Sequence, residues 1–388
     1  MRRRILGWTG LLIGLATLAF FLIAPGVVER GLNVVTGPVP PPVSPRVAAL
    51  HERLQIVDMH ADTLLWKRSL IDRADRGHVD LPRLRQGNVA LQVLSSVTQS
   101  PKNQNYDANG DDTDNITTLA VAQGQPVRTF GSLLERSLWH AEKLWRVRGD
   151  LRGIRVVRSQ KDLAELLASR RANKNFTGAM LSVEGLHNLE GRRDNLAKLY
   201  DAGYRMAGLT HFFDNPLAGS MHGLKKGGLT PFGLQIVRDM ESRGMVVDIA
   251  HCSHACVADI LRIATRPVVS SHGGVQATCR VNRNLTDDEI RGVARTGGVV
   301  GIGYWDAAVC DTSPKGIVRA IAHVRDLVGI DHVGLGGDYD GSVTTQFDTS
   351  RLDAITQALA DAGFGDDDIA KVMGGNTIRV LMQALPAR

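Results

Sequence analysis

The chain has 388 residues, of which 43% are hydrophobic and 22% charged, a composition typical of a globular protein. Its net charge of +6 would be compatible with binding to nucleic acid or to an anionic membrane. Half of that excess lies in residues 1–30, where four arginines stand against one glutamate, and no comparable basic run follows. Only 5% of the residues are aromatic, which leaves few side chains for base stacking. We therefore do not expect a nucleic-acid partner.

The first predicted element is an N-terminal transmembrane helix. Ile5 to Ala24 is an uncharged and mostly apolar stretch, and about 20 such residues span the hydrocarbon core of a bilayer. Three arginines precede this stretch, which places its start in the cytoplasm by the positive-inside rule. A cleaved signal peptide is the alternative, although no clear small-residue cleavage site follows Ala24. We expect residues 1–30 to be an uncleaved anchor, with the folded body periplasmic or otherwise extracytoplasmic.

The next predicted segment is a proline-rich linker at residues 31–46. Five prolines fall within residues 36–46, a composition typical of a semi-rigid, extended spacer. The remaining residues, 47–388, are numerous enough for one large domain.

Eight short apolar runs follow along the chain, and amphipathic segments separate most of them. The runs are Leu54–Met59, Val89–Leu94, Gly178–Val183, Tyr204–Leu209, Met245–Ala250, Pro267–Ser270, Gly298–Tyr304 and His332–Gly336. The helical segments include Asn195–Asp201, Pro231–Arg243, Ala255–Ala264, Asp287–Arg295, Gly316–Val328 and Leu352–Ala362. Continuous β-branched runs are typical of strands buried on both faces of a parallel sheet. Eight β–α repeats predict a TIM-like (β/α)8 barrel, with an open doubly wound sheet as the alternative.

Six of the eight runs are followed closely by a histidine or a carboxylate. These residues are His60 with Asp62, Glu184, His211, His251, His272, and Asp338 with Asp340. The C-terminal ends of barrel strands form one rim, where the catalytic groups of this fold lie. We therefore expect these residues, although far apart in the sequence, to converge on one site.

Five of these residues predict a metal centre. His60 and Asp62 lie two apart on a strand, so their side chains face the same side and can chelate one cation. A carboxylate at the end of a buried strand, as Glu184 is, needs a partner, and a pair of cations would supply it. His251 and His272 offer imidazole, the commonest metal ligand. Each residue alone would more often be structural, and the prediction depends on their common position at strand ends.

The other candidates have less certain roles. His211 is compatible with a metal ligand or with a group that polarises a substrate carbonyl, and we favour the second role. Asp338 is the better candidate for proton transfer, whereas Asp340 is compatible with a structural cap. Cys252, His254 and Cys256 mimic a zinc cluster, but no second cysteine pair follows at the spacing of a zinc finger.

Taken together, these motifs resemble the membrane dipeptidase (renal dipeptidase) family of metallopeptidases. The resemblance covers roughly residues 50–385. The matching stretches are Val57–Asp62, Val183–Gly185, Leu209–His211, Asp248–His251, Ser270–His272, Asn282–Asn284, Gly334–Gly341 and Gly375–Val380. The ordered set is specific to the family, although each piece alone is weak.

The resemblance implies two zinc ions. His60 and Asp62 would hold one ion, His251 and His272 would hold the other, and Glu184 with a water or hydroxide would bridge them. It also implies that three further residues contact the substrate: Asp338, His211 and Arg283. Asp338 and His211 would in addition have catalytic roles.

The implied activity is hydrolysis of dipeptides that carry a free C-terminal carboxylate, which Arg283 would bind. Dipeptides with a C-terminal D-residue are further expected substrates. Cys279 and Cys310 are similar to a pair that forms a disulfide in animal members, and a homodimer is implied by the same members. The segment Asn103–Asn115, rich in Asn and Asp, is predicted to be a loop, and substrate preference would depend on it if it borders the pocket.

Two other functions fit the sequence less well. Amidohydrolases that open cyclic amides or lactones usually begin with an H-x-H motif and bridge their metals with a modified lysine, whereas this chain has His60-Ala61-Asp62 and Glu184. A non-catalytic, membrane-tethered binding protein would be expected to have lost a ligand or Asp338, and none is missing.

Overall fold

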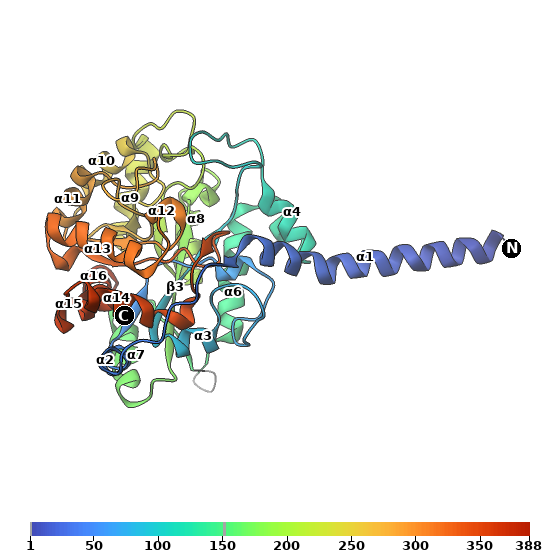
Figure 1. Ribbon diagram of the computed structural model, residues 1–388. Coiled ribbons are helices and arrows are strands. Elements are labelled where there is room, and N and C mark those ends of the chain that lie inside the picture. The colour runs from blue at the N-terminus through green and yellow to red at the C-terminus, as the bar shows by residue number, and fades with distance from the viewer. Residues whose placement is uncertain (1, 150–152) are drawn as a thin grey trace.

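The structure is a computed structural model that describes residues 2–149 and 153–388, without the side chains of residues 2–7, 10–13, 16 and 18. Eight parallel strands close into a barrel at the centre of the body (Figure 1). The barrel strands are β2 (Ile56–Asp58), β3 (Val89–Val97), β5 (Thr177–Glu184), β6 (Tyr204–Gly208), β7 (Val246–Asp248), β8 (Val269–Ser270), β9 (Val299–Ile302) and β10 (Val333–Leu335). Closure is complete because β10 pairs with β2 and β3 pairs directly with β5.

The predicted (β/α)8 architecture is confirmed, because each of the eight apolar runs contains or largely overlaps one barrel strand. A doubly wound sheet is excluded by the pairing of the last barrel strand with the first. The sequence patterns missed β4 (Ile154–Val156), which lies beside the start of β5 and outside the barrel.

Helices surround the barrel (Figure 1). Beyond α1 they are α2 (Pro45–Arg53), α3 (Leu81–Gln86), α4 (Asn115–Ala122), α5 (Arg128–Gly131), α6 (Leu133–Val147), α7 (Gln160–Ala172), α8 (Asn195–Ala202), α9 (Pro231–Arg243), α10 (His254–Ile263), α11 (Asp287–Arg295), α12 (Asp306–Val309), α13 (Pro314–Val328), α14 (Asp353–Asp361), α15 (Asp366–Ala370) and α16 (Asn376–Ala384). Local sequence fixes several of their starts: Thr286 and Glu289 form a capping box at α11, and Thr230 caps α9 just before Pro231.

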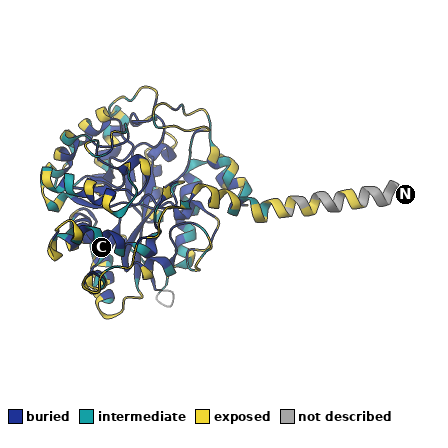
Figure 2. Cartoon of the chain, viewed as in Figure 1, coloured by how far each residue is buried: buried dark blue, intermediate teal, exposed yellow. Residues whose placement is uncertain are grey.

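The core lies on both sides of the barrel wall (Figure 2). Successive strand residues pack into different clusters, because alternate side chains of a strand point to opposite faces. Val246 belongs to the cluster that includes Met59, Met180 and Met206, whereas its neighbour Val247 packs in the cluster that includes the surrounding helices. Burial on both faces explains why the strands were continuous apolar runs.

The N-terminal segment begins with α1 (Arg2–Leu32), whose first half projects from the body (Figure 1). Among the described residues, no helix combines the length and apolar character that crossing a bilayer requires. The predicted anchor lies partly outside the described residues, because several side chains between residues 5 and 18 are not described. After α1, the strand β1 (Val34–Val35) pairs in parallel with β11 (Thr344–Thr345). Arg351 donates hydrogen bonds to the carbonyls of Pro40 and Pro41, so the proline-rich segment lies against the barrel domain.

Cys279 and Cys310 form a disulfide with an S–S distance of 2.04 Å, as the family resemblance implied. The bond joins the segment that follows β8 to the end of α12. Cys252 and Cys256 are free and buried.

Candidate active site

The carboxyl ends of the barrel strands bring the predicted site residues together. Glu184 is the last residue of β5, and the other residues lie two to four positions beyond the ends of β2, β6, β7, β8 and β10: His60, Asp62, His211, His251, His272 and Asp338. All seven side chains are buried, with at most 8% of any of these residues exposed. The expected convergence therefore occurs on one rim of the barrel.

Glu184 lies at the centre of the cluster, and its two oxygens face different groups. Its Oε2 lies 3.3 Å from His60 Nε2. Its Oε1 lies 2.7 Å from His251 Nε2 and 3.3 Å from His272 Nε2. The two Nε2 atoms of His251 and His272 are 3.0 Å apart. One carboxylate thus faces two separate sets of nitrogen ligands.

His60 also lies near two other carboxylates. Its Nε2 is 3.6 Å from Asp62 Oδ1 and 3.8 Å from Asp338 Oδ1. Among the described residues, three groups have ligand atoms close enough to hold an ion: His60 with Asp62 and Glu184; Glu184 with His211 and His251; and His60 with His272 and Asp338. The first group matches the set predicted for one metal. The second shows that His211 is within ligand distance, so its two alternative roles are both compatible with its position.

Unpaired buried atoms in the cluster fit a bound cation. His60 Nε2, Asp62 Oδ1 and Glu184 Oε2 have no hydrogen-bond partner within the described part of the chain. Burial of polar and charged atoms without a partner is costly. Imidazole nitrogen and carboxylate oxygen are the donors that zinc and similar divalent metals accept. The residues present therefore fit a metal centre at this rim.

The charges of the cluster suit metal ligation. Burial lowers the pKa of His251 and of His272 well below the usual range, and Arg283 lowers both further, which favours the neutral imidazole in each. Burial alone would also lower the pKa of His60, but the carboxylates of Glu184 and Asp62 raise it well above its usual value. Burial raises the pKa of Asp338 well above its ordinary range, and Glu184 and Asp62 add to that effect against the opposing influence of His60.

Residues behind the cluster fix its geometry, and sequence reasoning missed them. Asp58, at the end of β2, accepts hydrogen bonds from the backbone N–H of His60 (3.0 Å) and of Gly337 (3.1 Å) and from the Tyr304 hydroxyl (2.9 Å). Ser271 Oγ lies 2.8 Å from His272 Nδ1, the ring nitrogen that faces away from Glu184. Such partners orient the ligands of metal sites. Asp58 lies within the apolar run Leu54–Met59, and its sequence position does not show that it points behind the site.

A cavity opens in front of the cluster. It is lined by Asp62, Glu184, His211, His251, Arg283 and Asp338 together with Gln104, Tyr106 and Phe212. Gln104 and Tyr106 come from the predicted loop Asn103–Asn115, so that loop does border the pocket. The guanidinium of Arg283 lies 4.7 Å from the ring centre of Trp305, and its Nη1 donates to the carbonyl of His272 (3.1 Å). A buried cation thus faces the same cavity as the carboxylates.

His211 has a defined tautomer. Its Nδ1 lies 3.2 Å from the carbonyl of Gln99, which can only accept, so Nδ1 carries the proton. Burial lowers the pKa of His211, which favours the neutral ring. In that form Nε2, 3.5 Å from Glu184 Oε1, has a free lone pair and accepts rather than donates.

Of the histidines outside the cluster, His254 behaves as predicted. His254 pairs with Glu289 at 2.6 Å and takes no part in a zinc cluster with Cys252 and Cys256, both of which are buried. His222 also lies near the site, because its ring stacks on Phe212 with 4.6 Å between centroids. It supports the cavity wall.

Two sets of imidazole and carboxylate ligands around a shared glutamate, at the carboxyl rim of a (β/α)8 barrel, define a candidate metal-dependent hydrolase. The sequence profile of the membrane dipeptidase family (peptidase family M19) matches residues 44–387. The chain therefore belongs to the membrane dipeptidase family and is a metallopeptidase that hydrolyses peptide bonds.

Individual relatives agree with this assignment. The dipeptidase aclJ of Aspergillus oryzae is 29% identical over 353 residues, which cover 85% of this chain and 78% of that protein. Among solved structures, the probable dipeptidase PvdM from Pseudomonas aeruginosa has a TM-score of 0.72 at 20% identity, covering 88% of this chain and 99% of that one. A metallopeptidase from Rhodobacter sphaeroides, liganded with a phosphinate mimic of the dipeptide L-Ala-D-Ala, has a TM-score of 0.67 at 21% identity and covers 85% and 99%.

The central position of Glu184 generates a first prediction. Glu184→Gln is expected to lower the bound metal content by about half or more, because a neutral amide cannot balance the charge of bound cations as a carboxylate does. Elemental analysis of dialysed protein measures this content. Glu165→Gln, which removes an exposed carboxylate paired with Lys161, is the matched control and should keep full content. Unchanged metal content in Glu184→Gln would refute the shared-ligand geometry.

Proposed function

We propose that the protein is a zinc-dependent dipeptidase with a binuclear centre. The observation that carries the proposal is the position of Glu184, whose two oxygens face His60 on one side and His251 with His272 on the other. His60 and Asp62 would hold one ion and His251 and His272 the other, with Glu184 shared. Mixed imidazole and carboxylate ligands favour zinc.

When bound, the cations supply a water nucleophile that ionises near neutral pH and polarise the amide carbonyl. The chain's own residues handle the proton. Asp338 lies at the rim beside His60 and faces the cavity. We assign it to take the proton of the attacking water and to deliver it to the leaving amine.

Arg283 is proposed to bind the substrate's C-terminal carboxylate. Its guanidinium is buried, lines the same cavity as Asp338 and has the planar fork that pairs with a carboxylate through two hydrogen bonds. An arginine fixed this close to the candidate metal ligands favours substrates in which the free carboxylate lies near the scissile bond, as in a dipeptide. The ligand of the Rhodobacter sphaeroides structure, a mimic of L-Ala-D-Ala, supports including C-terminal D-residues in the proposal.

His211 is proposed to contact the substrate. With Nδ1–H donated to Gln99, its neutral Nε2 would accept a hydrogen bond from a substrate N–H. Polarising a carbonyl, the role favoured from the sequence, would require the doubly protonated ring.

The test of the function is amino-acid release from a panel of L,L- and L,D-dipeptides and from their C-terminal amides. We expect zinc-dependent cleavage of free dipeptides, loss of activity after chelation that zinc restores, and at least tenfold slower cleavage of the amides, because Arg283 then lacks its anionic partner. Equal cleavage of dipeptides and amides would contradict the carboxylate-binding site. No cleavage by folded, metal-loaded protein would favour the cyclic-amide or lactone alternative.

Arg283→Ala is expected to raise KM for a dipeptide by about tenfold or more with a smaller change in kcat, because the charge-assisted contact that is lost is made to the substrate carboxylate and not to the scissile bond. The neighbouring exposed Arg280 provides the control, and Arg280→Ala should leave both constants unchanged. Steady-state kinetics with each variant separates the two constants. A wild-type KM in Arg283→Ala would refute the assignment.

We also propose that the N-terminal segment attaches the enzyme to a membrane with the barrel on the extracytoplasmic side, and that the active form is a homodimer. Support for the attachment comes from the uncharged stretch Ile5–Ala24 behind three arginines and from exposed apolar side chains such as Trp8, Phe20 and Ile23. The full chain should float with lipid vesicles in a density gradient, and a chain lacking residues 1–24 should not. Sedimentation of the full chain away from vesicles would contradict the proposed membrane attachment. Light scattering measures the molar mass in solution and so tests the proposed homodimer.

A further inference from the structure

The base of α1 is built into the barrel domain on one face. Pro25, Glu29 and Asn33 are spaced four residues apart, which places them on the same side, and all three are buried. Val28 and Arg30, on the other faces, are exposed. Because Glu29 and Asn33 are buried at the base of a projecting helix, we expect both side chains to have specific partners in the barrel domain.

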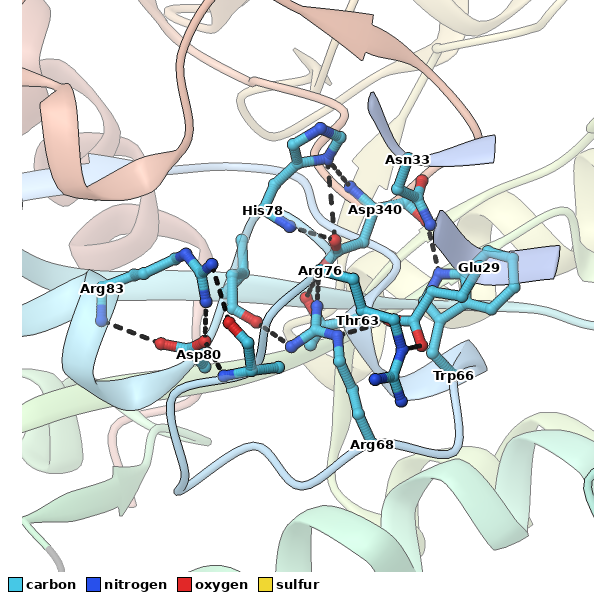
Figure 3. A network of polar contacts seen from close by, with 12 residues as sticks. Glu29, Asn33, Thr63, Trp66, Arg68, Arg76, His78, Asp80, Arg83 and Asp340 are labelled. Atoms are coloured by element: carbon cyan, nitrogen blue, oxygen red, sulfur yellow. Dashed lines mark hydrogen bonds and ion pairs between the residues drawn. The ribbon is translucent and has the colours of Figure 1, made fainter. Parts of the chain in front are cut away.

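The partner of Glu29 leads towards the active site (Figure 3). Arg68 Nε donates to Glu29 Oε1 at 2.5 Å, and Arg76 Nε donates to Glu29 Oε2 at 2.9 Å. The same guanidinium donates through Nη2 to Asp340 Oδ2. The side chains of Glu29, Arg68 and Asp340 are each at most 2% exposed, so this ion-paired chain is shielded from solvent.

Every polar atom of Asp340 has a hydrogen-bond partner. Its Oδ1 accepts from the backbone N–H of His78 (2.6 Å), and its Oδ2 also accepts from the Thr63 hydroxyl (2.7 Å). Its backbone N–H donates to His78 Nδ1 (3.0 Å), and its carbonyl accepts from Trp66 Nε1 (2.7 Å). Asp340 is therefore structural, as the sequence allowed, and it fixes the backbone two residues from Asp338.

Asn33 and β1 hold the next residues of the same segment. Asn33 Oδ1 accepts from the backbone N–H of Ser342 (2.8 Å), and the N–H of Val34 donates to the carbonyl of Val343 (3.2 Å). The parallel pairing of β1 with β11 continues these contacts to Thr345. We call Glu29, Asn33 and β1 the N-terminal strap, and Asp338–Val343 the rim loop.

The rim loop lines the cavity and has an unusual backbone. Asp338, Gly341, Ser342 and Val343 all face the cavity. Asp338, Asp340 and Ser342 have φ values of 55°, 63° and 62°, in the left-handed region that few residues other than glycine adopt. Such a conformation persists only when surrounding contacts determine it. Two of those contacts come from Asn33 and Val34 of the strap, more than 300 residues earlier in the chain.

We propose that the N-terminal strap is a positioning element for the reaction: Glu29, acting through Arg68 and Asp340, and Asn33, acting on Ser342, hold the rim loop so that Asp338 faces the cavity. The inference rests on the proposed role of Asp338. The strap precedes residues 44–387, the part of the chain that matches the family profile.

The test compares Glu29→Ala and Asn33→Ala with wild type in the full-length chain. Each variant is expected to lower kcat on a dipeptide about tenfold with KM within about twofold, because a displaced proton-transfer group slows the reaction more than it weakens binding. Hydrogen exchange should become faster in residues 338–345 and stay unchanged in the barrel strands. Glu29→Gln, which keeps an acceptor for Arg68, should retain more of kcat than Glu29→Ala. Arg30→Ala is the control, since it removes only an exposed ion pair with Asp75 from the same helical turn.

Unchanged kcat in the folded variants would overturn the proposal, and so would exchange that accelerates evenly across the barrel. Asn33→Ala, which removes no charge, carries the test if Glu29→Ala fails to fold. The proposed function and the proposed role of the strap can be refuted independently of each other. Wild-type protein inactive on dipeptides refutes the proposed function, whereas unaltered exchange in the rim loop refutes the strap whatever the substrate.

Discussion

The buried carboxylate of Glu184 is the constraint on which the site depends. Four histidine Nε2 atoms, from the ends of β2, β6, β7 and β8, lie within 3.5 Å of its oxygens. A carboxylate at this depth is tolerated only with charged or hydrogen-bonding partners. The strand ends must therefore keep their mutual register to supply them, and a barrel closed by continuous pairing provides that rigidity. The division of histidine nitrogens between the two carboxylate oxygens, not any single residue, is the observation that supports the proposed two-metal site.

A second layer of hydrogen bonds, behind the cluster, fixes the positions of the side chains at the strand ends. Asp58 bonds to the N–H groups of both His60 and Gly337, which ties the end of β2 to the segment that leads to Asp338. The backbone N–H of Asp62 donates to the carbonyl of Tyr339 (2.9 Å), which links the same two segments again. The N-terminal strap extends this layer from outside the barrel. The candidate metal ligands, the candidate proton-transfer residue and the N-terminal strap thus form one connected structure.

Much of this arrangement was predictable from the sequence, because it depends on local patterns. Eight apolar runs gave the barrel strands, and histidines and carboxylates placed just after those runs gave the cluster, since strand ends share a rim. Contacts between distant segments carry no local signal. The pairing of β1 with β11, the Glu29–Arg68–Asp340 chain and the role of Asp58 could not be read from any motif. The tautomer of His211 likewise depends on a carbonyl 112 residues away.

The most direct test of the two-metal account is anomalous diffraction at the zinc absorption edge from crystals of the zinc-loaded protein. The account predicts two peaks on opposite sides of the Glu184 carboxylate, one beside His60 and Asp62 and the other beside His251 and His272. A single peak, or peaks that are not both in contact with Glu184, would contradict it.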